Sequence, residues 1–115
     1  MSLYLVIFRG ADHDEEIAAV EIGPYSRFSE FRDDVARLAE SGHRGSRFPT
    51  LMNHVDSDGE WTPDEARVLI RELSDLETSI PNIREHVDIE GRPLVESIRQ
   101  LARSSLSEGR PIEFQ

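Results

Sequence analysis

The fold depends most on one central segment, residues 47–65, which reads Arg-Phe-Pro-Thr-Leu-Met-Asn-His-Val-Asp-Ser-Asp-Gly-Glu-Trp-Thr-Pro-Asp-Glu. Its end, Thr62-Pro-Asp-Glu65, predicts the start of a helix: Thr caps the first turn, Pro takes the first helical position, and Glu closes a capping box. Apolar residues then recur at helical spacing as far as Leu76. The helix should end before Ile80, because a residue that precedes proline avoids helical geometry.

The chain before this segment predicts two strands and a helix. Residues 3–9 and 17–22 are apolar runs rich in strand formers, joined by a polar connector of the hairpin type. The first run is continuously apolar, so we expect it to be a central strand. A helix should follow, with Ser26 as its N-cap and Gly42 as its left-handed end.

The chain after the segment predicts a short strand, a helix and a closing strand. Residues 87–89 favour the short strand, Pro93 the start of the helix and Gly109 its end. Residues 111–114 alternate as a strand does, and the leading proline favours an edge position. The whole chain, residues 1–115, is therefore expected to form a single α+β domain, in which a small, mainly antiparallel sheet carries helices on one face.

The composition limits the classes of function. The chain has 23 acidic residues and 13 basic ones, all arginine, and a net charge of −10. Such acidity disfavours nucleic acid and anionic membranes as partners and favours basic ones, although it is also typical of a protein that is merely soluble. There is no cysteine, which excludes disulfides and thiolate catalysis. The N-terminus lacks the features of a signal peptide, so we expect a cytoplasmic protein.

The acidic residues of the central segment follow the spacing of an EF-hand calcium loop. With Gly59 at the sixth position, the candidate calcium ligands are Asp56, Asp58, Glu60 and Glu65. The first position holds His54, however, and imidazole is a poor ligand for calcium. Glu65 also has a second role in the capping box. The alternative function is thus a calcium-responsive regulatory module at residues 54–65, and a loop of this shape without metal is the favoured interpretation.

No catalytic signature is present, so an enzyme is not expected. His54 could serve a hydrolase together with a nearby carboxylate, but a structural hydrogen bond is the simpler role. His13, in the polar connector, is expected to be solvated. Arg47 is either an anchor for a partner or, as we favour, an ion-pair partner of the acidic loop. Trp61 is expected in the core, with partner contact as the second option.

Four pieces of the sequence, taken in order, resemble a known family. They are Leu3-Tyr-Leu-Val-Ile-Phe8, Gly45-Ser-Arg-Phe-Pro-Thr-Leu-Met52, His54-x-Asp56-x-Asp58-Gly-Glu-Trp-Thr-Pro63 and Gly109-Arg-Pro-Ile-x-Phe-Gln115. The family is number seventy of the bacterial polymorphic-toxin immunity proteins. The resemblance implies a small, non-catalytic cytoplasmic protein that binds and neutralises a cognate toxin domain encoded beside it, and it brings no catalytic residues.

A cognate toxin domain with a basic surface would suit the acidity of this chain. The residues most suited to contact it are those of the central segment: Arg47, His54, Asp56, Asp58, Glu60 and Trp61. No cofactor is expected.

Overall fold

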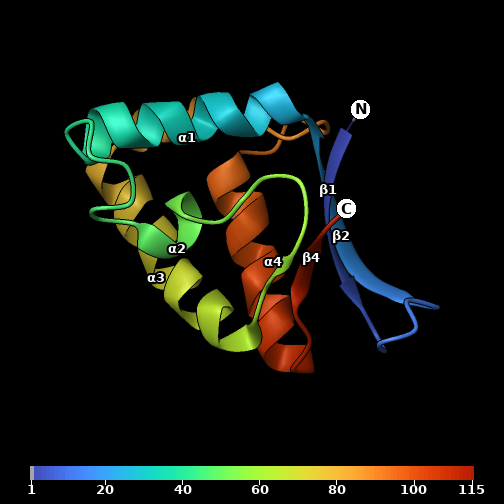
Figure 1. Ribbon diagram of the computed structural model, residues 1–115. Helices are drawn as coiled ribbons and strands as arrows, with labels where there is room; N and C mark the ends of the chain where they lie inside the picture. The colour runs from blue at the N-terminus through green and yellow to red at the C-terminus, as the bar shows by residue number, and fades with distance from the viewer. Residues whose placement is uncertain (1) are drawn as a thin grey trace.

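The fold is α+β, as predicted, with strands at both ends of the chain and helices between them (Figure 1). The computed structural model describes residues 2–115. The elements in order are β1 (Ser2–Phe8), β2 (Glu16–Pro24), α1 (Tyr25–Ala39), α2 (Pro49–Met52), β3 (Glu60–Trp61), α3 (Pro63–Ser79), the 3₁₀ helix η1 (Pro81–Glu85), α4 (Leu94–Glu108) and β4 (Ile112–Phe114).

The four strands form one antiparallel sheet in the order β2-β1-β4-β3. The central place of β1 confirms the prediction from its apolar run. The edge position predicted for β4 is wrong, because β3 pairs with its other side through Glu60↔Glu113 and Trp61↔Ile112. A strand of two residues is too short to show alternating apolar and polar residues. Residues 60–61 were therefore predicted as loop.

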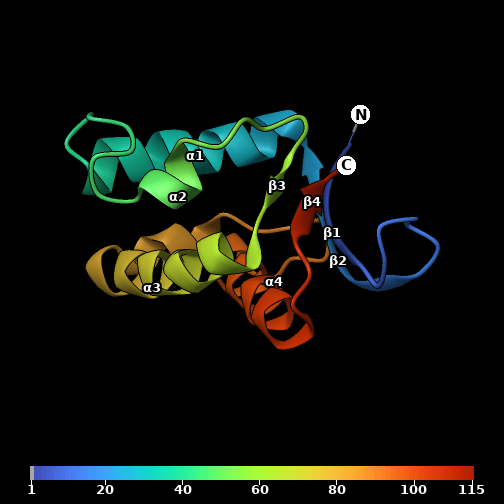
Figure 2. The same ribbon diagram turned by 60° about the horizontal axis from the view of Figure 1, so that its bottom comes forward.

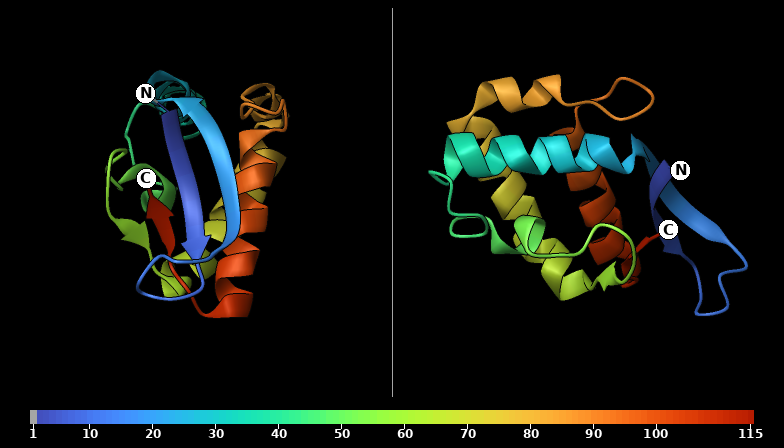
Figure 3. Two further views of the ribbon diagram at one scale, coloured as in Figure 1. Left: turned by 90° about the vertical axis from the view of Figure 1, so that its right-hand side faces the viewer. Right: turned by 45° about the horizontal axis from the view of Figure 1, so that its top comes forward.

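The helices cover one face of the sheet and leave the other face open (Figures 2 and 3). Leu3, Leu5 and Ile7 of β1 point to the helical side and are fully buried in the core. Tyr4 lies between them in sequence and points the other way, with 41% of its surface exposed. β1 thus separates the core from a sheet face that no helix covers, although Val6 on that face is itself only 5% exposed.

The long helices match the predicted apolar stripes, but α1 begins earlier than expected. Its N-cap is Pro24, so the prediction of Ser26 as the cap is wrong. The start of α3 confirms the prediction: Thr62 is its N-cap, and both bonds of the capping box form. Gly109 closes α4 in the left-handed conformation, with φ of 64°. None of the helices over residues 2–115 combines the length and apolarity that crossing a membrane requires.

The segment between α3 and α4 differs from its prediction. Residues 87–89 do not form a strand, because Val87 makes only one isolated bridge, to Pro93. The buried carboxylate of Asp88 shapes this turn: it accepts hydrogen bonds from the backbone N–H groups of Glu90 (2.9 Å) and Arg92 (3.0 Å) and from the hydroxyl of Ser97 (2.6 Å). Side-chain bonds to the main chain therefore replace strand pairing here.

We predict that Thr62→Ala lowers the free energy of unfolding by about 1 kcal/mol, because the N–H group of Glu65 loses its acceptor. The measurement is urea denaturation followed by circular dichroism. Thr78→Ala, at an exposed position in the same helix, is the matched control and should leave stability unchanged within about 0.5 kcal/mol. Equal losses in both variants would contradict a capping role for Thr62.

Candidate functional site

The central connection, which we define as residues 40–62, joins α1 to α3 and is held by buried charged side chains. The first is Glu40, directly after α1, which is only 4% exposed. Its carboxylate accepts hydrogen bonds from the backbone N–H groups of Gly45 (3.0 Å), Arg47 (2.9 Å) and Phe48 (2.9 Å). Three charge-assisted bonds offset the desolvation of the carboxylate and fix the loop to the end of α1.

The second buried charge, Glu72, lies in the middle of α3. Its two oxygens accept from the backbone N–H groups of Thr50 (3.1 Å) and Leu51 (2.9 Å). These are donors in the first turn of α2, which has no side-chain cap of its own. Glu72 therefore replaces the missing cap and attaches α2 to α3.

The third buried charge, Arg32 of α1, binds the other end of α2. Its guanidinium donates to the carbonyl oxygens of Leu51 (3.3 Å), Met52 (3.4 Å) and His54 (2.5 Å). It also lies 4.4 Å from the ring centroid of Phe28, a cation–π contact. Burial lowers the pKa of Arg32 from its usual value and the positive charge of Arg44 acts in the same direction, whereas the carboxylates of Asp56 and Asp33 oppose the shift. Both ends of α2 are thus bound by charges from neighbouring helices.

His54 fixes the acidic loop that follows α2. Its Nδ1 lies 2.6 Å from the carbonyl oxygen of Val55, and its Nε2 lies 2.9 Å from that of Glu60. The ring stacks on Phe114 of β4, with centroids 4.1 Å apart and an interplanar angle of 14°. The predicted structural hydrogen bond of His54 is confirmed. Both ring nitrogens face main-chain oxygens, so neither is directed at a carboxylate with which it could act in hydrolysis.

The carboxylates of the acidic loop point in different directions. Asp58 and Glu60 are exposed, and Asp56 is half-buried. Glu65 is used in the capping box, where its Oε1 accepts from the backbone N–H of Thr62 at 3.0 Å. Over residues 2–115, no three side chains of His, Cys, Asp or Glu gather as they would around a metal ion. The side chains as they lie therefore do not assemble the calcium site that the spacing suggested.

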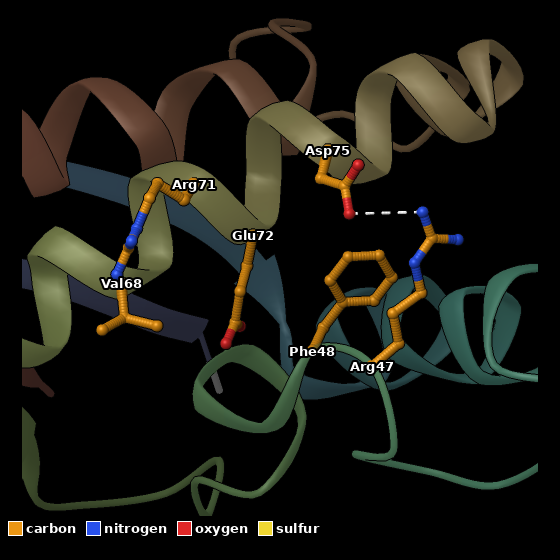
Figure 4. Close-up of a pocket in the computed structure, with 6 residues that line it drawn as sticks. All are labelled: Arg47, Phe48, Val68, Arg71, Glu72 and Asp75. Carbon is orange, nitrogen blue, oxygen red and sulfur yellow. Dashed lines mark hydrogen bonds and ion pairs between the residues drawn. The ribbon is translucent and has the colours of Figure 1, made fainter.

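Arg47 forms an ion pair, but its partner is not the acidic loop as expected. Its guanidinium lies 3.2 Å from the carboxylate of Asp75 on α3 (Figure 4). It also donates to the hydroxyl of Ser79 on the same helix at 2.7 Å. It also lies 5.0 Å from the ring centroid of Phe48. Arg47 thus closes one end of an open groove of about 360 Å³ between α3 and the central connection.

Trp61 is part of the core, as favoured. Its side chain is fully buried, its Nε1 donates to the carbonyl oxygen of Thr50 at 3.0 Å, and its ring meets that of Phe114 edge-on at 4.8 Å. In this conformation the indole presents no surface to a partner. The candidate contact residues that remain accessible are Arg47, Asp56, Asp58 and Glu60, with His54 behind them as a support.

The sequence analysis missed the three charges that hold the central connection. Arg32 and Glu72 each stand beside an apolar residue of a helical stripe, next to Phe31 and Leu73 respectively. A charge at the border of an apolar stripe was the available signal, and it is weak because such residues usually extend to solvent. His13 is exposed, as expected, and it also lies 3.0 Å from the carboxylate of Glu113, a contact that the sequence did not reveal.

A model of a protein family matches residues 12–86 of the chain. The matching description is Immunity protein 70. The chain belongs to the Immunity protein 70 family. The matched range runs from the β1–β2 hairpin loop to the residue after η1 and contains the whole central connection. The two terminal pieces of the resemblance, residues 3–8 and 109–115, lie outside it.

Membership of the Immunity protein 70 family agrees with a non-enzymatic, partner-binding role. Searches of curated proteins and of solved structures give no match. The fold described above therefore carries the structural argument by itself.

We predict that Glu40→Ala lowers the free energy of unfolding by about 3 kcal/mol, because three backbone N–H groups lose a charged acceptor. Glu40→Gln should lower the free energy of unfolding by less, since the amide oxygen of the new side chain still accepts a hydrogen bond. Urea denaturation measures both.

The matched control is Glu30→Ala on the exposed side of α1, which should change stability by no more than about 0.5 kcal/mol. A Glu40→Ala protein as stable as the Glu30→Ala control would show that the carboxylate does not fix the central connection.

Proposed function

We propose that this protein is an immunity protein that binds the cognate toxin domain of a polymorphic toxin system and neutralises it by stoichiometric occlusion. It acts in the cytoplasm and without catalysis. The observation that carries the proposal is the family match over residues 12–86. An inhibitor that acts by binding alone needs one accessible and stable contact surface. It does not need an assembled catalytic group.

The preorganisation of the central connection supports this proposal. Loops that must become ordered on binding weaken a complex, because the lost conformational freedom opposes association. Here Glu40, Glu72 and Arg32 hold the loop backbone from two helices before any partner arrives. A loop that is already fixed can form a tight complex with few contacts.

The charge of the protein supports a basic partner. A net charge of −10 attracts a domain with a positive surface and accelerates its association. A toxin domain that acted on nucleic acid would carry such a surface, because it must bind phosphates. In the exposed part of the central connection, Asp58 and Glu60 form no ion pair within residues 2–115, so their charges remain free for a partner.

The direct test is co-expression. We expect that the toxin domain encoded beside this gene arrests growth when it is induced alone, and that growth is restored when this protein is co-induced. A one-to-one complex should then co-purify. Rescue should fail against a toxin domain from an unrelated system, which is the specificity control. A lack of both rescue and complex with the neighbouring toxin domain would refute the proposal.

We predict that the triple variant Asp56→Asn, Asp58→Asn and Glu60→Gln associates with the toxin domain about tenfold more slowly at low salt, because local steering is lost. Its dependence on ionic strength should also be flatter than that of the wild type. Stopped-flow fluorescence over a series of salt concentrations measures both effects.

The matched control removes three exposed carboxylates elsewhere, in Glu30→Gln, Glu85→Gln and Glu108→Gln. It has the same net charge as the first variant but keeps the acidic loop. Equal association rates for the two triple variants would show that the overall charge, and not the acidic loop, attracts the partner.

A further inference from the structure

The sheet face that no helix covers carries a row of side chains across all four strands. In this row Glu60 is exposed, Val6 is buried, and the side chain of Glu113 is 15% exposed. The register aligns Ala19 of β2 with Val6 of β1, Val6 with Glu113 of β4, and Glu113 with Glu60 of β3. We call these four residues, together with Tyr4, the outer sheet face. The helices lie behind the sheet and none covers this side (Figure 3).

Two carboxylates of this row stand directly opposite each other. Glu60 and Glu113 are cross-strand partners, and like charges in such a pair repel. The imidazole of His13 reaches Glu113 at 3.0 Å, whereas Glu60 has no ion-pair partner among residues 2–115. The side chain of Glu113 is only 15% exposed and already has His13 beside it, so Glu60 is the member of the pair that a cation from outside reaches.

Tyr4 adds an exposed aromatic ring beside this acidic row. It is paired with Glu21 of β2, and a hydrogen bond with that carboxylate raises the pKa of the Tyr4 phenol above its usual value near 10. A tyrosine at the centre of a four-stranded sheet with 41% exposure offers both an apolar ring and a hydroxyl to a partner. Such residues are common anchors of protein interfaces.

We propose that the outer sheet face is the surface on which the toxin domain docks, with arginine or lysine side chains of that domain seated between Tyr4 and the Glu60–Glu113 pair. This inference rests on the proposed function and specifies its contact surface. A basic side chain would neutralise the repelling carboxylates through its charged end and lie along the tyrosine ring with its stem.

Charge complementarity selects this occupant over a second copy of the chain. A two-fold dimer through the same face would bring two copies of one acidic surface together. Like charges across an interface oppose association. The groove beside Arg47 is a weaker candidate for the toxin, because Asp75 already neutralises that arginine.

The sharpest test is Glu60→Arg, because it separates stability from binding. The new arginine would stand opposite Glu113 and turn a repulsive pair into an attractive one. The melting temperature of the variant should therefore be equal to or higher than that of the wild type. Binding to the toxin domain should nevertheless weaken by about tenfold or more, because a basic side chain now meets the basic partner. Tyr4→Ala, which removes the exposed ring, should weaken binding to a similar extent.

Glu30→Arg on α1 is the matched control, since it makes the same change of charge on a helical surface away from the sheet. Its affinity should stay within about twofold of the wild type at physiological salt. Affinities are measured by isothermal titration with the purified toxin domain, and growth rescue is measured in parallel.

The possible outcomes distinguish the two proposals. If the wild type binds and rescues but Glu60→Arg and Tyr4→Ala do so equally well, the toxin docks elsewhere and the present inference is wrong. The same holds if Glu30→Arg weakens binding as much as Glu60→Arg. If the wild type itself neither binds nor rescues, the proposed function fails, and the inference fails with it.

Discussion

Hydrogen bonds between the main chain and buried charged side chains hold the irregular part of this protein together. The connection between α1 and α3 has only one short helix, α2, so most of its backbone groups need partners outside regular structure. Glu40, Glu72 and Arg32 supply them from the flanking helices. Removing one of these charges would leave several polar groups unpaired at once, so the shape of the loop depends on very few side chains.

This arrangement also explains how the sheet acquires its fourth strand. The acidic loop leaves α2 and returns to β4, where Glu60 and Trp61 pair with residues of the C-terminal strand. His54 fixes the return by stacking on Phe114 and bonding to the carbonyl of Glu60. The fixed loop therefore brings a carboxylate from the middle of the chain beside Glu113 near its end. The uncovered sheet face becomes acidic through this pairing.

Local signals in the sequence were sufficient for much of the fold but not for its connections. The capping box at Thr62, the apolar stripe of α4 and the continuous apolarity of β1 each predict an element that the structure contains. The interior position of β4 could not be predicted, because the two-residue strand β3 beside it leaves no periodic pattern. The roles of Glu40 and Glu72 depend on contacts with residues distant in sequence, which residue spacing alone does not reveal. The EF-hand spacing had the opposite weakness, since it suggested a set of ligands that residues 2–115, as they lie, do not bring together.

The most direct measurement is a titration of the isotope-labelled protein with the unlabelled toxin domain, followed by nuclear magnetic resonance of the backbone amides. Our account predicts that the spectrum stops changing at one equivalent and that the largest shifts fall in β1, β4 and residue Glu60, with small shifts along α1. No change at equimolar toxin domain would contradict the binding function. Saturation with shifts confined to α1 and α3 would contradict the outer sheet face as the contact surface.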